Sequence, residues 1–156
     1  AAWGTRSVEG AVGGEADRTG TLGDALGEEE LFSRIRRDPA SRPTGALSVV
    51  PAAHHRRMAH RDIAVYAAEA TLEWSEPLAR GEESLGEYTL TYPDLGRTLS
   101  ITFEQGFPHR ILAWEERDDD GQAVTRAELT HAVLLDYWNH NGVDDGAWRE
   151  ALGLEF

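Results

Sequence analysis

The clearest pattern in the chain is a strict alternation of apolar and polar residues between positions 87 and 104. Apolar side chains stand at every second position in two runs: Tyr88, Leu90 and Tyr92, then Leu99, Ile101 and Phe103. Between the runs, residues 93–96 (PDLG) have Pro early and Gly late, which is typical of a turn. The pattern therefore predicts a β-hairpin with one buried face.

A second hairpin is predicted after it. Residues 110–116 alternate less cleanly, and residues 118–121 (DDDG) read as a hairpin turn. The partner, residues 122–135, should then be a strand. However, residues 125–128 (TRAE) form a capping-box pattern and residues 141–142 (NG) a helix end, so a helix extending to 139 remains the alternative.

Residues 63–74 (IAVYAAEATLEW) fit both a strand and a helix. Their alternation favours a strand, whereas four Ala favour a helix. We expect a strand, because the segments that follow are β.

Two short helices are predicted near the ends of the chain. Residues 28–37 carry acids in the first turn and Arg in the last, which suits the helix dipole. Residues 144–153 begin with Asp and end at Gly. We therefore expect an α+β or mainly β domain. Its antiparallel sheet has four to six strands, centred on 63–135, with one face covered by the helices near 28–37 and 144–153.

The distribution of Gly along the chain predicts where the folded domain begins. Residues 1–27 hold seven of the 16 Gly and read as a flexible lead-in with at most one short strand. Residues 28–156 form the single predicted domain, a size that buries a substantial core.

The net charge of the chain bears on its expected source and on its expected binding partners. The net charge is −13, and all 15 basic residues are Arg, so the chain contains no Lys. High salt would favour both features, because it screens the self-repulsion of an acidic surface. We expect a halophilic or halotolerant source, with GC-rich codon usage as the alternative. The acidity argues against binding to nucleic acids or anionic membranes. The chain contains no run of 18 apolar residues, so no transmembrane helix is predicted.

Three histidines lie close together in residues 54–61 (HHRRMAHR). His54, His55 and His60 could bind a transition metal. Their spacing fits no standard ligand pattern, and the neighbouring arginines would repel a cation. A metal-dependent hydrolase that uses this cluster is the enzymatic alternative.

The same segment is the most concentrated positive patch of an acidic chain. We expect Arg56, Arg57, His60 and Arg61 to face the domain's own carboxylates or an anionic ligand, because Arg binds carboxylates and phosphates through paired hydrogen bonds.

The sequence does not support the other kinds of site considered, such as a calcium-binding loop or a nucleophile motif. Neither Asp-rich loop, at 118–121 or 139–145, has the Glu that an EF-hand requires at its last position. Phosphate-loop and nucleophile-elbow motifs are absent, as is Cys. Most aromatic side chains in the β region are expected in the core, with part of the set able to line an apolar pocket instead: Tyr88, Tyr92, Phe103, Phe107, Trp114, Tyr137 and Trp138.

The sequence thus favours a non-catalytic module that binds a ligand or a protein partner and needs no cofactor. The Ala-Ala start fits a cleaved signal peptide and predicts an exported, extracellular or periplasmic protein. A structural fragment of a larger protein is a further alternative. The identity of the ligand and the oligomeric state stay open.

Overall fold

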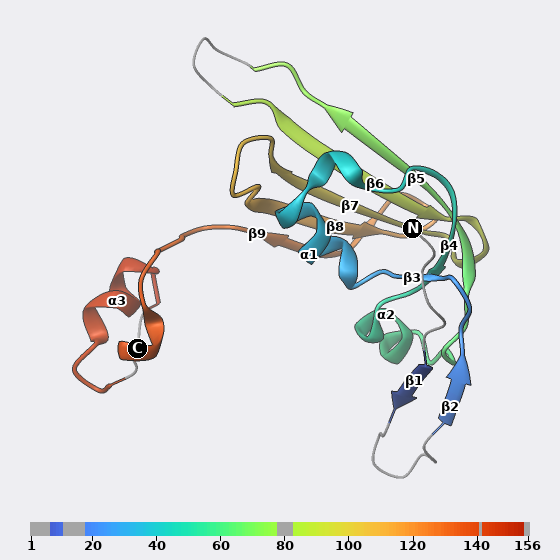
Figure 1. Ribbon diagram of the computed structural model, residues 1–156, viewed down its shortest axis with the longest axis horizontal. Coiled ribbons are helices and arrows are strands. Elements are labelled where there is room, and N and C mark those ends of the chain that lie inside the picture. The colour runs from blue at the N-terminus through green and yellow to red at the C-terminus, as the bar shows by residue number, and fades with distance from the viewer. Residues whose placement is uncertain (1–6, 11–17, 78–82, 141, 155–156) are drawn as a thin grey trace.

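A curled seven-stranded sheet dominates the computed structural model, which describes residues 7–10, 18–77, 83–140 and 142–154 (Figure 1). The strands follow one another in chain order from β3 to β9. Their bounds are β3 (Leu26–Gly27), β4 (Gly45–Val50), β5 (Tyr66–Trp74), β6 (Leu85–Tyr92), β7 (Arg97–Glu104), β8 (Ile111–Arg117) and β9 (Ala123–Glu128). Strands β3 and β4 are parallel, and the other neighbours are antiparallel. A separate antiparallel pair joins β1 (Ser7–Gly10) and β2 (Arg18–Thr21).

The hairpin predicted from the alternating pattern is confirmed as β6 and β7. A 3-10 turn, η2 (Pro93–Leu95), links the strands and ends at Gly96, whose φ of 56° is a left-handed conformation that favours glycine. Side chains at alternate positions of both strands are buried. The period of two therefore fixes which face of the sheet enters the core.

The core lies between this face and helix α1 (Glu30–Arg37). Leu31 and Ile35, one turn apart, are fully buried on the helix face that meets the sheet. Sheet residues complete the core: Val49, Ala68, Ala70, Tyr88, Leu90, Tyr92, Leu99, Ile101 and Phe103. Helix α2 (Ala53–Met58) follows β4, and the short 3-10 helix η1 (Pro39–Ser41) follows α1. Among the described residues, no helix has the length and apolar character needed to cross a membrane.

The mainly β fold is confirmed, whereas the strand number and the purely antiparallel sheet were wrong. The main sheet has seven strands because β3, inside the predicted lead-in of 1–27, adds a parallel edge beside β4. The strand favoured for 63–74 is present from Tyr66 to Trp74. The strand predicted at 122–135 ends at Glu128, and no helix forms from 129 to 136.

The C-terminal helix was predicted to cover the sheet, and this was wrong. Helix α3 (Gly146–Ala151) forms as expected, but it lies apart from the sheet together with the 3-10 helix η3 (Tyr137–Asn139) (Figure 1). Residues 122–135 contain no Gly, Pro, Asn, Asp or Ser, so this stretch lacks the residues that favour a sharp reversal toward the sheet.

Candidate functional site

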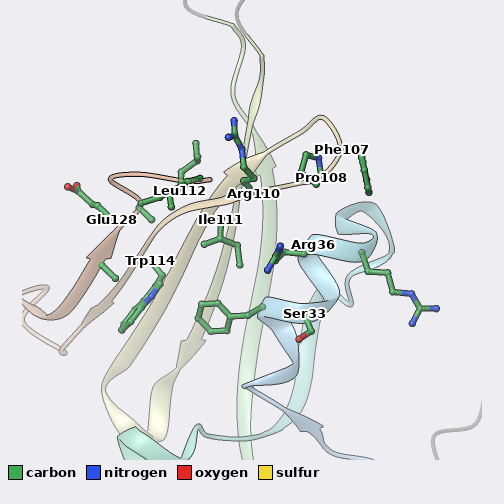
Figure 2. Close-up of a pocket in the computed structure, with 15 residues that line it drawn as sticks. Ser33, Arg36, Phe107, Pro108, Arg110, Ile111, Leu112, Trp114 and Glu128 are labelled. Atoms are coloured by element: carbon green, nitrogen blue, oxygen red, sulfur yellow. The ribbon is translucent and has the colours of Figure 1, made fainter. Parts of the chain in front are cut away.

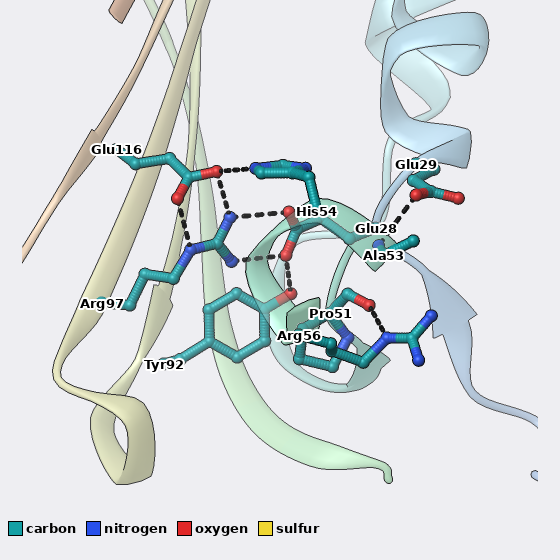
Figure 3. A network of polar contacts seen from close by, with 9 residues as sticks. All are labelled: Glu28, Glu29, Pro51, Ala53, His54, Arg56, Tyr92, Arg97 and Glu116. Carbon is teal, nitrogen blue, oxygen red and sulfur yellow. Dashed lines mark hydrogen bonds and ion pairs between the residues drawn. The ribbon is translucent and has the colours of Figure 1, made fainter. Parts of the chain in front are cut away.

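Two features stand out: a buried ionic network at one end of the sheet and an open groove between α1 and β8. In the network, Arg97 lies between two carboxylates (Figure 3). Its Nη1 and Nη2 donate to Glu28 at 2.5 and 2.7 Å, and its Nε and Nη2 donate to Glu116 at 3.1 and 2.8 Å. All three residues are at least 95% buried. Each carboxylate thus receives two hydrogen bonds from one guanidinium.

Two further side chains complete the network. The Tyr92 hydroxyl donates to Glu28 at 2.6 Å, and the Arg97 guanidinium lies 5.3 Å from the centre of the Tyr92 ring. His54 Nε2 lies 2.5 Å from Glu116, and the imidazole is 52% exposed. The network therefore ties α2 to the β3–α1 connection and to strands β6, β7 and β8.

The pKa shifts reflect this pairing. Burial alone would raise the pKa of Glu116, but the hydrogen bonds and charge of Arg97, with the contact to His54, lower it. Burial would lower the pKa of Arg97, but its hydrogen bonds to Glu28 and Glu116 raise it. Burial and the neighbouring Glu28 raise the pKa of Tyr92. The network therefore holds the Glu116 carboxylate and the Arg97 guanidinium in their charged forms.

These contacts give the network a structural role. Acid–base catalysis by a carboxylate pair needs groups that can reach a substrate. Here both carboxylates are buried and bound to the same guanidinium. One signal for this site was present in the sequence. Arg97 stands in phase with Leu99 and Ile101 on the buried face of β7, a position where an unpaired charge would be costly.

The predicted histidine cluster is divided between different environments. His54 joins the network, His55 is half-buried, and His60 lies exposed just beyond α2 with a φ of 51°. Burial, followed by the charge of Arg97, lowers the pKa of His55. Within the part of the chain that the structure describes, no group of three or more potential ligands is placed to hold a metal ion. The three imidazoles are not brought together.

The predicted basic patch does not pair with the protein's own acids in the described ranges. Arg56 donates from Nε to the carbonyl of Pro51 at 3.0 Å. Arg57 and Arg61 are exposed, and no ion pair between described residues includes them. An anionic ligand for this patch stays a prediction.

The groove has a volume of about 870 Å³ and lies between α1 and the end of the sheet formed by β8 and β9 (Figure 2). Phe32, Ile111 and Trp114 line it and pack against the core. The Trp114 ring lies 6.3 Å from the Phe32 ring, edge to face, and 6.2 Å from the His54 ring. Trp114 therefore lies between the groove and the ionic network.

Exposed cations line the helix side of the groove. Arg36 and Arg37, in the last turn of α1, are exposed, and among the described residues neither forms an ion pair or a hydrogen bond. Figure 2 shows Arg36 reaching from α1 toward Ile111. Arg110, by contrast, binds Glu104 through Nε at 2.8 Å and Nη2 at 2.5 Å. The groove thus combines apolar rings with two uncompensated positive charges.

The sequence pattern indicated these groove residues only in part. Phe107 and Trp114 belonged to the aromatic set, of which Tyr88, Tyr92 and Phe103 do lie in the core. Phe107 is 86% exposed at the groove. Arg36 and Arg37 were interpreted only as favourable charges at a helix end. Tertiary packing places them at the same groove as Trp114, and no local sequence pattern predicts that proximity.

Comparisons with protein-family models, curated proteins and solved structures found no match for this chain.

Proposed function

We propose that this protein is a non-catalytic binding module whose groove receives an apolar, acidic polypeptide segment of a partner protein. The observation that carries the proposal is the pair Arg36 and Arg37 beside the Phe32 and Trp114 rings. In a chain of net charge −13, this local excess of positive charge selects for an anionic ligand. Arg also binds carboxylates through two parallel hydrogen bonds.

The openness of the groove favours a polypeptide over a small molecule. Small-molecule sites enclose most of their ligand. Here Phe107, Pro108 and Arg110 remain exposed along one wall. Strand β9 supplies residues of the opposite wall, and in the described ranges it pairs only with β8. Its outer edge therefore offers backbone hydrogen bonds to an extended segment.

The lining residues support binding rather than catalysis. The groove residues include one carboxylate, Glu128, and one hydroxyl, Ser33, and no His or Cys. Glu128 is ion-paired to Arg126. The lining therefore lacks the adjacent base that would activate a hydroxyl nucleophile.

A pair of designed peptides tests this function. The first alternates Asp with Leu and Trp and carries a fluorescent label; the second is identical except that Lys replaces each Asp. Fluorescence anisotropy should show the purified protein binding the acidic peptide and not the basic one. The double variant Arg36→Gln/Arg37→Gln should weaken binding on the order of tenfold, since each charge-assisted contact contributes about 0.5–1 kcal/mol at an exposed site.

The matched control is Arg117→Gln, which removes an exposed arginine at the end of β8, outside both the groove and the predicted basic patch. It should leave the affinity unchanged. Equal binding of both peptides, or equal loss of affinity in the groove variant and the control, would contradict a role for the groove. General attraction between the peptide and any exposed Arg would then explain the data.

A further inference from the structure

The segment after β9 is a projecting arm with an apolar surface. This C-terminal arm, described for residues 129–140 and 142–154, runs away from the sheet and contains α3 near its end (Figure 1). Leu134 and Val143 are almost fully exposed, and Tyr137 and Trp138 are about two-thirds exposed. Trp148 and Leu154 of the arm are also exposed, whereas Leu129 lines the groove of its own chain. A dense set of this kind usually marks an interaction surface.

The arm has local structure of its own. His140 contacts Asp136 at 3.1 Å and Asp145 at 3.2 Å, and its ring lies 5.4 Å from the ring of Trp148. The Asp145 carboxylate also accepts from the backbone N–H of Gly142 at 2.8 Å. The exposed apolar residues are therefore presented by an ordered element, which reduces the entropy lost on docking.

We propose that the C-terminal arm of a second copy of this chain occupies the groove, and that two copies exchange arms reciprocally. This inference rests on the proposed function, because it names the partner segment. The arm carries four acids, Asp136, Asp144, Asp145 and Glu150, and one Arg, a net charge of −3. The groove presents the uncompensated Arg36 and Arg37. Aromatic and acidic side chains of the arm thus match aromatic and basic side chains of the groove.

The direction of the arm favours a second copy over the same chain. The N–H of Leu129 still donates to the carbonyl of Leu112 at 2.7 Å, so the start of the arm is fixed to β8. From there no helix or strand forms up to residue 136, and eight residues can span up to about 25 Å when extended. Residues 129–135 contain no Gly, Pro, Asn, Asp or Ser, so this first part of the arm has no residue that favours a tight turn back to its own groove.

The size of the arm fits a stable dimer. A standard interface uses about 20–30 residues on each side. Leu129 and Ala132 line the groove of their own chain, so the docking part of the arm has 22 residues, from 133 to 154. A two-fold exchange forms the arm–groove contact twice. Each copy then gives an arm and receives one.

Charge reversal in two separate variants tests the exchange. The groove variant is Arg36→Glu/Arg37→Glu, and the arm variant is Asp144→Arg/Glu150→Arg. Sedimentation equilibrium should show a dimer for the unmodified full chain and at least about tenfold weaker self-association for each variant. An equimolar mixture should restore the dimer. In that mixture, the acidic arm of the groove variant meets a basic groove, and the basic arm of the arm variant meets an acidic one.

The matched control, Arg117→Glu, reverses one exposed charge outside both the groove and the predicted basic patch and should dimerise as the unmodified chain does. Far-UV circular dichroism checks that every variant is folded. A monomeric unmodified chain, or a mixture that does not recover the dimer, would overturn the exchange. If the unmodified chain is monomeric yet binds the acidic peptide, the exchange fails and the proposed function stands. If it does neither, both fail.

Discussion

Replacing Arg97 with Met removes the guanidinium that pairs both buried carboxylates of the network. Met has a similar length and fills much of the same space, so the main change is electrostatic. Glu28 and Glu116 each lose two hydrogen bonds from Arg97, and both are at least 95% buried. Tyr92 and His54 retain their contacts with these carboxylates. The variant therefore isolates the contribution of the central cation.

Removing one partner of a buried ion pair costs about 3–5 kcal/mol, mainly because the remaining charge is left buried. We expect the free energy of unfolding to fall by about 4 kcal/mol at neutral pH, a large share of the roughly 5–15 kcal/mol of a typical domain. The triple variant Glu28→Gln/Arg97→Met/Glu116→Gln removes all three charges. It should recover much of the loss, because a buried network without charges is far less costly than an unpaired one.

The pH dependence provides the sharper test. In the unmodified protein, the pKa of Glu116 is below its ordinary value of 4.5. Its pairing therefore contributes stability that is present above that value and is lost as the pH falls through the lowered pKa. Without Arg97, burial raises the pKa of Glu116. Near that raised pKa the native variant binds more protons than the unfolded chain, so its stability should increase as the pH falls through the raised pKa toward the ordinary value of 4.5.

Urea unfolding followed by tryptophan fluorescence across a pH series measures both slopes. The control is Arg110→Met, which breaks the exposed pair with Glu104 and should change stability little. If the Arg97 variant were as stable as the Arg110 variant, or if its stability did not increase on acidification, the network would not hold its carboxylates as described.

Three further predictions concern stability. Gly86→Ala would place a Cβ 2.5 Å from the Phe103 ring, so calorimetry should show a loss of about 1–3 kcal/mol; adding Phe103→Leu should recover part of it in a double-mutant cycle. Tyr92→Phe removes a donor to the buried Glu28 and should cost about 1–3 kcal/mol in urea unfolding, with no change in the native circular dichroism spectrum. Because the net charge is −13, the thermal midpoint should keep rising with NaCl beyond about 0.5 M. A flat or falling midpoint would indicate that GC-rich codon usage, and not adaptation to salt, explains the composition.

The sequence predicted those parts of the fold that depend on local patterns. Strands β6 and β7 follow from a period of two and a turn with Pro and Gly, which act over a few residues. Helix α1 follows from its charges and its apolar face. The location of α3 could not be predicted in this way, because caps determine where a helix begins and ends and not what it packs against.

The site was harder to predict for the same reason. Glu28 and Arg97 are 69 residues apart, and His54 and Glu116 are 62 residues apart. Nothing in the neighbourhood of Glu28 separates it from Glu29, which is exposed. Only the three-dimensional arrangement shows which acid is buried beside Arg97, and the histidine cluster was divided by the same packing.

The long separations within the ionic network have a consequence for folding kinetics. Its contacts join residues from 19 to 69 positions apart, so chain-closure entropy must be lost before any of them forms. Proteins dominated by such non-local contacts fold slowly. The network also links α2 and the segment before α1 to strands β6 to β8. Neither half of residues 26–128 could therefore complete its interior alone, and the sheet should assemble in one cooperative step.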